Sequence, residues 1–169
     1  MVTANAQDNA QPPIPEFKNK VMFVNKTNTL AELESIALTL SSKAGFGKGS
    51  NYLRVDGVTS SVSHSGTPKN RFIVKIDPGT DPSTTIYLYK FEVDKKYRKI
   101  LTGTVGIGGV KDGKIVTMPL TFTKVSDGVY IVSPKDQLPD GEYVFTVNNP
   151  ITNTSNQETK GFGFSVAQS

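Results

Sequence analysis

Cysteine is absent from this 169-residue chain, and histidine occurs only once. The lack of cysteine excludes disulfides, thiolate zinc sites and cysteine nucleophiles. No apolar run approaches the ~18 residues that a membrane-spanning helix needs. A chain of this length can bury a core without cross-links, so the lack of disulfides does not argue against an oxidising compartment. We therefore expect one domain, or one domain with a short appendage, and no transmembrane segment.

Concentrated positive charge is also lacking. The formal net charge is +4 and the pI about 9.2, but the basic residues are scattered along the chain. The one basic cluster consists of Lys95, Lys96, Arg98 and Lys99. Nucleic-acid binders usually gather their charge on one face or helix. We therefore do not expect nucleic acid among the partners.

The N-terminal segment has the composition of a flexible arm. Residues 1–16 are rich in Asn, Gln and Pro, which bury little surface. Ala4 and Ala6 stand at the −3 and −1 positions of a cut after Ala6, as at the end of a secretory signal peptide. The segment predicts a periplasmic or secreted protein with a flexible tether.

Residues 17–50 predict a short strand followed by a helix. The strand covers residues 21–24. Thr29 and Glu32 have the spacing of a helical capping box. The apolar positions that follow at helical spacing are Leu30, Leu33, Ile36, Ala37 and Leu40. Together they predict one amphipathic helix over residues 29–43, which the glycines of residues 45–49 end.

Residues 51–169 predict an antiparallel β domain. Apolar residues alternate with other residues along 71–76, 116–123, 142–147 and 162–167, which is typical of half-buried strands. Turn dipeptides separate these runs, namely Asp56-Gly57, Pro78-Gly79, Asp112-Gly113, Asp127-Gly128 and Asp140-Gly141. The fold class expected is mainly β, an immunoglobulin-like antiparallel sandwich with one N-terminal α-helix.

Two residues in these runs carry specific expectations. Pro119 cannot donate a hydrogen bond to a ladder, so its strand should lie at a sheet edge or be bulged there. Tyr143 follows the turn at Asp140-Gly141 and enters a strand, as the tyrosine corner of Greek-key sandwiches does. Its phenol should therefore donate a hydrogen bond back to the connecting backbone.

The order of the strand motifs also resembles a known group of domains. The motifs begin at Val55-Asp56-Gly57-Val58 and end at Gly141-Glu142-Tyr143-Val144-Phe145 and Phe162-Gly163-Phe164-Ser165-Val166. Over about residues 51–167 they resemble uncharacterised exported bacterial β-sandwich domains of the Bacteroidetes type, with their G-E-Y-x-F motif. The resemblance implies an extracytoplasmic sandwich and supplies no reaction or ligand.

No motif predicts catalysis, a metal or a cofactor. His64 lies in a turn-like stretch, and we interpret it as a solvated loop residue. No serine has the Gly-x-Ser-x-Gly context of a nucleophile elbow. Most acidic residues lie in turns, and glycine or proline adjoins each of Asp56, Asp77, Asp112, Asp127 and Asp140, so turn formation explains them. The segment 77–81 has too few oxygen ligands for calcium. The glycine-rich loops 45–49 and 103–109 do not match phosphate-binding loops, and we interpret both as structural.

Aromatic residues offer one alternative binding surface. Tyr87, Tyr89 and Phe91 share one face of a predicted strand, which forms either part of the core or an exposed platform for carbohydrate. The long polar segment 148–160 contains a formal glycosylation sequon at Asn153.

The sequence thus predicts an exported, non-enzymatic binding or assembly module that acts by surface recognition through strand edges or loops. Its partner would be another envelope or surface protein, or else polysaccharide. The alternative functions are a carbohydrate- or cell-wall-binding module that uses exposed Tyr87 and Tyr89, and a hydrolase that brings His64 and carboxylates into one pocket. The expected divisions are an arm at 1–16, the strand and helix at 17–50, and the sandwich at 51–169.

Overall fold

The computed structural model describes residues 11–45, 48–67, 69–106, 109–112, 117–148 and 159–167. Of these residues, those within 42–50 and 102–112 are described by their backbone only, and the others by their side chains as well. Nearly all of the regular structure is β-strand. In the described ranges the only helical element is the 3₁₀ turn η1 (Pro82–Thr84), and no helix is long and apolar enough to cross a bilayer.

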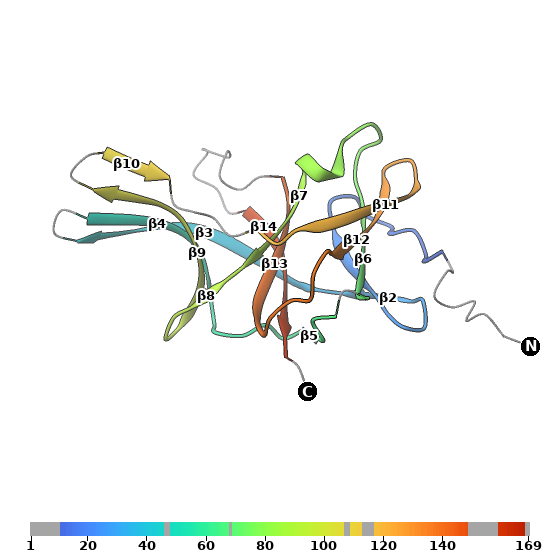
Figure 1. The fold of residues 1–169 in the computed structure, drawn as a ribbon, viewed down its shortest axis with the longest axis horizontal. Coiled ribbons are helices and arrows are strands. Elements are labelled where there is room, and N and C mark those ends of the chain that lie inside the picture. The colour runs from blue at the N-terminus through green and yellow to red at the C-terminus, as the bar shows by residue number, and fades with distance from the viewer. Residues whose placement is uncertain are drawn as a thin grey trace, which may run out of the picture.

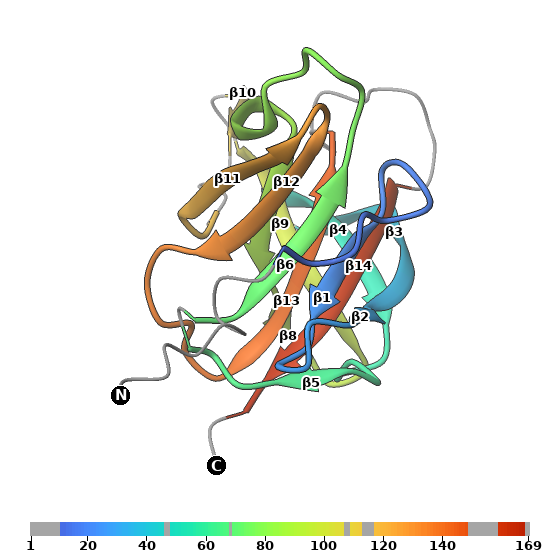
Figure 2. The ribbon, with the colours of Figure 1, turned by 90° about the vertical axis from the view of Figure 1, so that its right-hand side faces the viewer.

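Two antiparallel sheets form the molecule. The smaller sheet has the order β11-β12-β6-β1-β2. Its strands are β1 (Val21–Val24), β2 (Leu30–Glu32), β6 (Arg71–Lys75), β11 (Leu120–Ser126) and β12 (Val129–Pro134). In Figure 2 this sheet lies in front of strands β13 and β14 of the larger sheet. The mainly β, antiparallel architecture is confirmed, whereas the immunoglobulin-like strand order is not.

The larger sheet has the order β10-β9-β4-β3-β14-β13-β7 and curls nearly into a barrel. Its strands are β3 (Glu34–Gly45), β4 (Lys48–Asp56), β7 (Ile86–Lys90), β9 (Tyr97–Gly106), β10 (Gly109–Asp112), β13 (Gly141–Val147) and β14 (Thr159–Val166). The short β8 (Glu92–Val93) follows β7 directly and pairs with β9, which brings the two sides of the sheet together. β5 (Ser63–His64) pairs in parallel with the end of β14. Figure 1 shows the ends of β3, β4 and β9 projecting with β10 as a ribbon.

Each side of the curled sheet covers a core of its own. The core between the sheets contains Phe72, Leu88, Tyr143, Phe145 and Phe164, none more than 1% exposed. The core inside the curled sheet is formed by Ile36, Leu38, Leu53, Tyr89, Phe91, Ile100 and Val144. β13 and β14 lie between the two cores, so both faces of each strand are buried. The alternation in the sequence predicts only one buried face, so in this respect the prediction is wrong.

The predicted helix over residues 29–43 is wrong. These residues form β2 and most of β3, which pairs with β14 on one side and β4 on the other. Leu33 lies between the two strands and enters the core between the sheets, whereas Ile36 and Leu38 enter the barrel. Because Leu33 and Ile36 enter different cores, the apolar positions of two strands together have the spacing of a helix. Hydrogen bonding of β3 to β14 on one side and to β4 on the other outweighs the helix propensity of the segment. Gly45 pairs with Lys48 in a hairpin and does not end a helix.

Several local predictions are confirmed. The strand over residues 21–24 is β1, and the runs at 71–76, 142–147 and 162–167 overlap β6, β13 and β14. Of the described part of the run at 116–123, only the stretch from Leu120 onward forms a strand, so Pro119 lies just before it and not inside it. The strand after Pro119 is β11, which lies at a sheet edge. Its bulge falls later, between Lys124 and Ser126. Gly128 of the β11–β12 turn has φ +75°, and a side chain there would collide with the backbone of Ile76.

The tyrosine corner is also confirmed. Tyr143 is fully buried, and its Oη donates a 2.6 Å hydrogen bond to the carbonyl oxygen of Pro139. Its ring stacks on Phe164 with the centroids 5.7 Å apart. Burial raises the pKa of Tyr143 to about 12, because the phenolate would lose its hydration. The phenol therefore stays a hydrogen-bond donor at all ordinary pH values.

Candidate functional site

The aromatic row formed by Tyr87 and Tyr89 of β7 and by Phe91 directly after it belongs to the barrel core and not to an open platform. Tyr89 and Phe91 are 2% and 4% exposed. Tyr87 is half-buried, stacks on Tyr89 and donates a 3.0 Å hydrogen bond to the carbonyl of Thr84. Burial raises the pKa of Tyr89 to about 12. These side chains leave no flat, exposed surface on which a sugar could stack.

The turn aspartates are dispersed and engaged locally. Asp56, Asp77 and Asp127 lie on three separate turns and pair with Arg54, Lys18 and Lys124 at 2.8, 2.8 and 3.1 Å. Asp81 caps η1: its Oδ1 accepts hydrogen bonds from the backbone N–H and the hydroxyl of Ser83 at 2.9 and 2.7 Å. These bonds lower the pKa of Asp81. The side chain of Asp112 lies outside the described residues.

A buried ionic cluster near one end of the barrel was missed by sequence reasoning. The Arg98 side chain is 2% exposed, with Nη1 3.3 Å from Glu34 Oε2 and 3.7 Å from Glu142 Oε1. Its Nε donates to the carbonyl of Gly57 at 3.1 Å. Glu142 also accepts hydrogen bonds from the backbone N–H of Ser60 and the hydroxyl of Ser165. Every charge here is paired, so we interpret the cluster as structural.

His64 is anchored between the two sheets. β5 carries it, and the pairing of Val166 with His64 fixes its backbone. The imidazole stacks on Phe23, with the ring centroids 3.7 Å apart and the planes at 17°. Phe23 in turn makes an edge contact with Phe72 of the core at 5.4 Å. The sequence interpretation of His64 as a solvated loop residue is therefore wrong.

Burial disfavours the charged form of the His64 ring. Desolvation lowers its pKa from the ordinary 6.5, because the charged form would lose hydration. Its Nε2 is buried and has no hydrogen-bond partner within the described part of the chain. None of the aspartates or glutamates of that part lines the space around the ring, so the structure does not bring His64 together with the carboxylates that a hydrolase would need.

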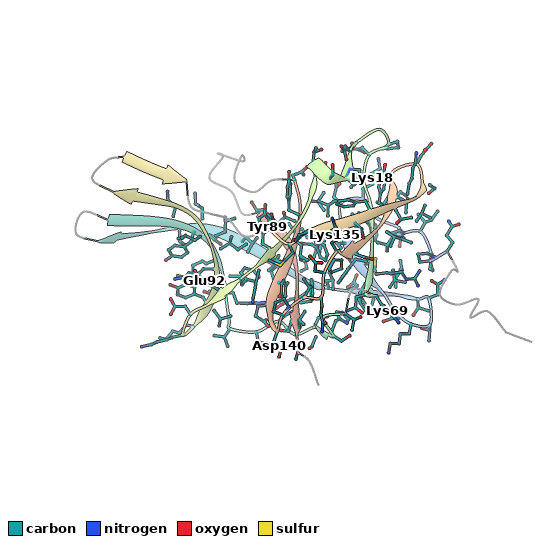
Figure 3. All side chains as sticks on the ribbon, in the orientation of Figure 1. Lys18, Lys69, Tyr89, Glu92, Lys135 and Asp140 are labelled. Atoms are coloured by element: carbon teal, nitrogen blue, oxygen red, sulfur yellow. The ribbon has the colours of Figure 1, made fainter. Side chains whose placement is uncertain are left out.

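A cleft of about 930 Å³ opens beside this ring. One wall is formed by the end of β1 and its turn, residues 23–27, and the other by residues of the segment 63–71. Both walls lie where β5 approaches β1 and β2 (Figure 2). In Figure 3, Lys69 points outward at the end of the molecule opposite the projecting ribbon. Two segments distant in sequence therefore build one site.

The cleft is strongly cationic. Lys26, Lys69 and Arg71 line it, and over the described ranges none of them forms an ion pair. The remaining polar lining consists of hydroxyl and amide side chains, namely Asn25, Thr27, Ser63, Ser65, Thr67 and Asn70. Three cations in a lining whose described residues include no carboxylate produce a local positive potential that attracts anions.

Backbone contacts hold both walls of the cleft in place. Gly66 is buried under Leu138, whose N–H donates a 2.8 Å hydrogen bond to the Gly66 carbonyl, and a side chain at Gly66 would collide with the Leu138 backbone. The Asn70 side chain donates to the carbonyl of Ser65. On the other wall, Asn25 N–H donates to the carbonyl of Thr29 at 2.8 Å. The cleft is therefore preformed, as most ligand sites are.

A second hollow lies on β3 and β4 but is already neutralised. It has a volume of about 580 Å³ and is lined by small side chains of β3 together with Arg54 and Asp56. Those two charges pair with each other at 2.8 Å. The His64 cleft is therefore the better candidate for a charged ligand.

Sequence reasoning singled out His64 in this cleft but missed Phe23, Lys26, Lys69 and Arg71. The one signal available was a pair of polar turns, each next to a basic residue, which is too common to locate a site. The sequon at Asn153 and the arm before residue 11 lie outside the described residues. No protein-family model matches the chain, and no curated protein and no solved structure shows significant similarity to it.

Proposed function

We propose that this chain is a non-enzymatic binding module that takes an anionic ligand in the His64 cleft. The observation that carries the proposal is the set of three cations, Lys26, Lys69 and Arg71, around a preformed cleft whose described lining contains no carboxylate. Charge-assisted hydrogen bonds from such groups are roughly twice as strong as neutral ones. Lys26 and Lys69 are exposed and Arg71 is half-buried, so salt should weaken their attraction for an anion.

The edge strands of the smaller sheet, β2 and β11, favour recognition in a cleft over the addition of a partner strand. β2 is only three residues long. β11 is preceded by Pro119, carries a bulge and displays the exposed Lys124. Short edges, bulges, prolines and lysines are the devices that discourage pairing with another strand. These features support loops, and not edges, as the recognition surface.

The experiment is a titration of the full chain with pyrophosphate. NMR spectra monitor the titration at low and at physiological ionic strength. We expect chemical-shift changes confined to residues 23–27 and 63–71, with affinity falling as salt rises. Lys69→Ala should weaken binding about fivefold, which corresponds to one charge-assisted hydrogen bond. Lys135→Ala removes the same charge outside the cleft and serves as the matched control.

Equal loss of binding in the Lys69 and Lys135 variants would show that only the net charge matters, and the site would be rejected. Shift changes spread over the whole surface would have the same meaning. Circular dichroism of each variant checks that the fold is unchanged.

We also propose that the module acts outside the cytoplasm, in the periplasm or after secretion, where its partner would be an envelope or surface component. Support comes from the Ala4 and Ala6 pattern and from the resemblance to exported sandwich domains. Fractionation of the native cells with an antibody to the chain tests this. Recovery in the cytoplasmic fraction alone would reject it.

A further inference from the structure

The polar lining of the cleft carries information beyond its charge. Ser63, Ser65 and Thr67 are exposed and line the cleft, and none of their hydroxyls bonds to another described residue. We propose that the ligand is an acidic saccharide, a sugar whose ring hydroxyls meet these groups and whose carboxylate or sulfate meets the cations. This inference rests on the proposed anion-binding function and specifies its ligand class.

The size of the cleft favours a ligand larger than a bare anion. Sites for small organic ligands have volumes of about 300–1,000 Å³, and this cleft, at about 930 Å³, lies near the upper limit. An inorganic phosphate would contact only a small part of the lining. A saccharide of one or more rings can reach both the 23–27 wall and the 63–71 wall.

The chemistry of the lining matches sugar hydroxyls. A serine or threonine hydroxyl donates one hydrogen bond and accepts others, as a sugar hydroxyl does. A phosphate or sulfate oxygen only accepts, so it leaves the acceptor capacity of Ser63, Ser65 and Thr67 unused. Lys26, Lys69 and Arg71 only donate, which suits the acidic substituent of the sugar.

The aromatic residues argue against a nucleotide. A base is usually recognised by stacking on an open aromatic face. Here one face of Phe23 is covered by His64, and its ring makes an edge contact with Phe72. His64 also has Phe164 nearby, with the centroids 6.3 Å apart and the rings tilted by 52°. Hydrogen bonds and charge, and not stacking, would therefore select the ligand.

The test compares four probes with the full chain by calorimetry: a sulfated heparin hexasaccharide, a hexagalacturonate, neutral maltohexaose and pyrophosphate. A short single-stranded DNA is added as the competing polyanion. We expect at least one acidic hexasaccharide to bind about tenfold more tightly than maltohexaose and than pyrophosphate, as several extra hydrogen bonds would give. Which one binds distinguishes sulfate from carboxylate as the acidic group.

Two variants separate the saccharide from the charge. The triple substitution S63A/S65A/T67A should weaken the acidic saccharide about fivefold or more and leave pyrophosphate within about twofold, because only the hydroxyl contacts are lost. Lys69→Ala should weaken both probes. Since the three hydroxyls are exposed, their removal should leave the circular dichroism spectrum and the thermal midpoint unchanged.

The outcomes are distinguishable. If pyrophosphate binds as tightly as the acidic saccharides, or the triple variant changes neither, the saccharide inference fails and the anion-binding function stands. Tighter binding of DNA than of either acidic saccharide would also overturn the inference. If no anionic probe binds, both the inference and the proposed function fail.

Discussion

Substituting Gly161 by alanine tests the nearly closed barrel directly. Gly161 faces the interior of the curled sheet, where an added Cβ would lie 2.6 Å from Val144 Cγ2 and 3.3 Å from Ile36 Cγ1. Overpacking a close-packed core costs about 1–3 kcal/mol. Removing glycine from the unfolded chain returns about 0.4–1 kcal/mol of this. We therefore expect Gly161→Ala to lower the free energy of unfolding by about 1–2 kcal/mol.

The same strand supplies a matched control. A Cβ at Gly163 would lie 3.4 Å from its nearest neighbours, which is ordinary van der Waals contact. The Cβ added by Gly163→Ala lies on the same side of β14 as the Cβ added by Gly161→Ala. It should change the stability by less than about 0.5 kcal/mol, or raise it slightly.

A second substitution should rescue the first. Val144 is fully buried, so Val144→Ala alone should cost about 2 kcal/mol through the lost methyl groups and the space they leave. In the double variant the alanine at 161 occupies part of that space. We expect a favourable coupling of at least about 1 kcal/mol in the double-mutant cycle.

The assay is urea unfolding monitored by circular dichroism. The slope of the free energy of unfolding against urea concentration should be the same in all variants, so that shifts in the midpoint report changes in stability. Additive effects of the two substitutions would refute the reasoning, since Gly161 and Val144 would then not be in contact. Equal losses for Gly161→Ala and Gly163→Ala would refute it as well, because the cost would then reflect glycine in the strand and not the narrow interior.

Three further predictions concern other parts of the molecule. Tyr143→Phe should cost about 1 kcal/mol in urea unfolding, because the part-buried hydrogen bond to the Pro139 carbonyl is lost; an unchanged midpoint would contradict the tyrosine corner. Arg98→Met should cost about 3–5 kcal/mol, because Glu34 and Glu142 lose their buried cation. Adding Glu142→Leu to this variant should recover part of that stability, and no recovery would speak against the ionic cluster. The lowered pKa of His64 predicts that stability present above pH 6.5 is lost as the pH falls towards the folded pKa, since the unfolded chain then binds the proton more readily. In His64→Phe this acid dependence should flatten, and an unchanged profile from pH 7 to 5 would assign it to other groups.

The local features of the fold could be read from the sequence because their causes are local. The alternation along Tyr143–Val147 and Phe162–Val166 places one set of aromatic side chains on one face of each strand. The turn at Asp127-Gly128 requires a positive φ that glycine supplies. The Tyr143 phenol reaches only four residues back along the chain. None of these depends on which distant strands pair.

The helix error shows where local reasoning stops. The apolar residues of the segment 29–43 fit a helix if all of them lie on one face. They fit strands equally well if Leu33 enters one core and the residues after it enter the other. Only the pairing of β3 with β14 and β4 decides between the two. β4 is the next strand along the chain, but β14 lies far away in the sequence. A pattern within one segment carries no record of its partners.

The candidate site could be predicted even less well. His64 attracted attention only as the single histidine, and its burial arises because β5 pairs with β14 while Phe23 on β1 covers the ring. Lys26 and Lys69 come from turns that are ordinary by composition. Their convergence in one cleft depends on the packing of one sheet on the other.

The sequence by itself determined a mainly β chain, its main turns, the edge position of the strand after Pro119 and the corner at Tyr143. Only the tertiary structure decided that the larger sheet curls around a second core, that Arg98 is buried between two glutamates, and that three cations surround an open cleft. The first set follows from side-chain periodicity and backbone sterics within a few residues. The second depends on pairing and packing between distant segments, whose free energy exists only once the whole chain is folded.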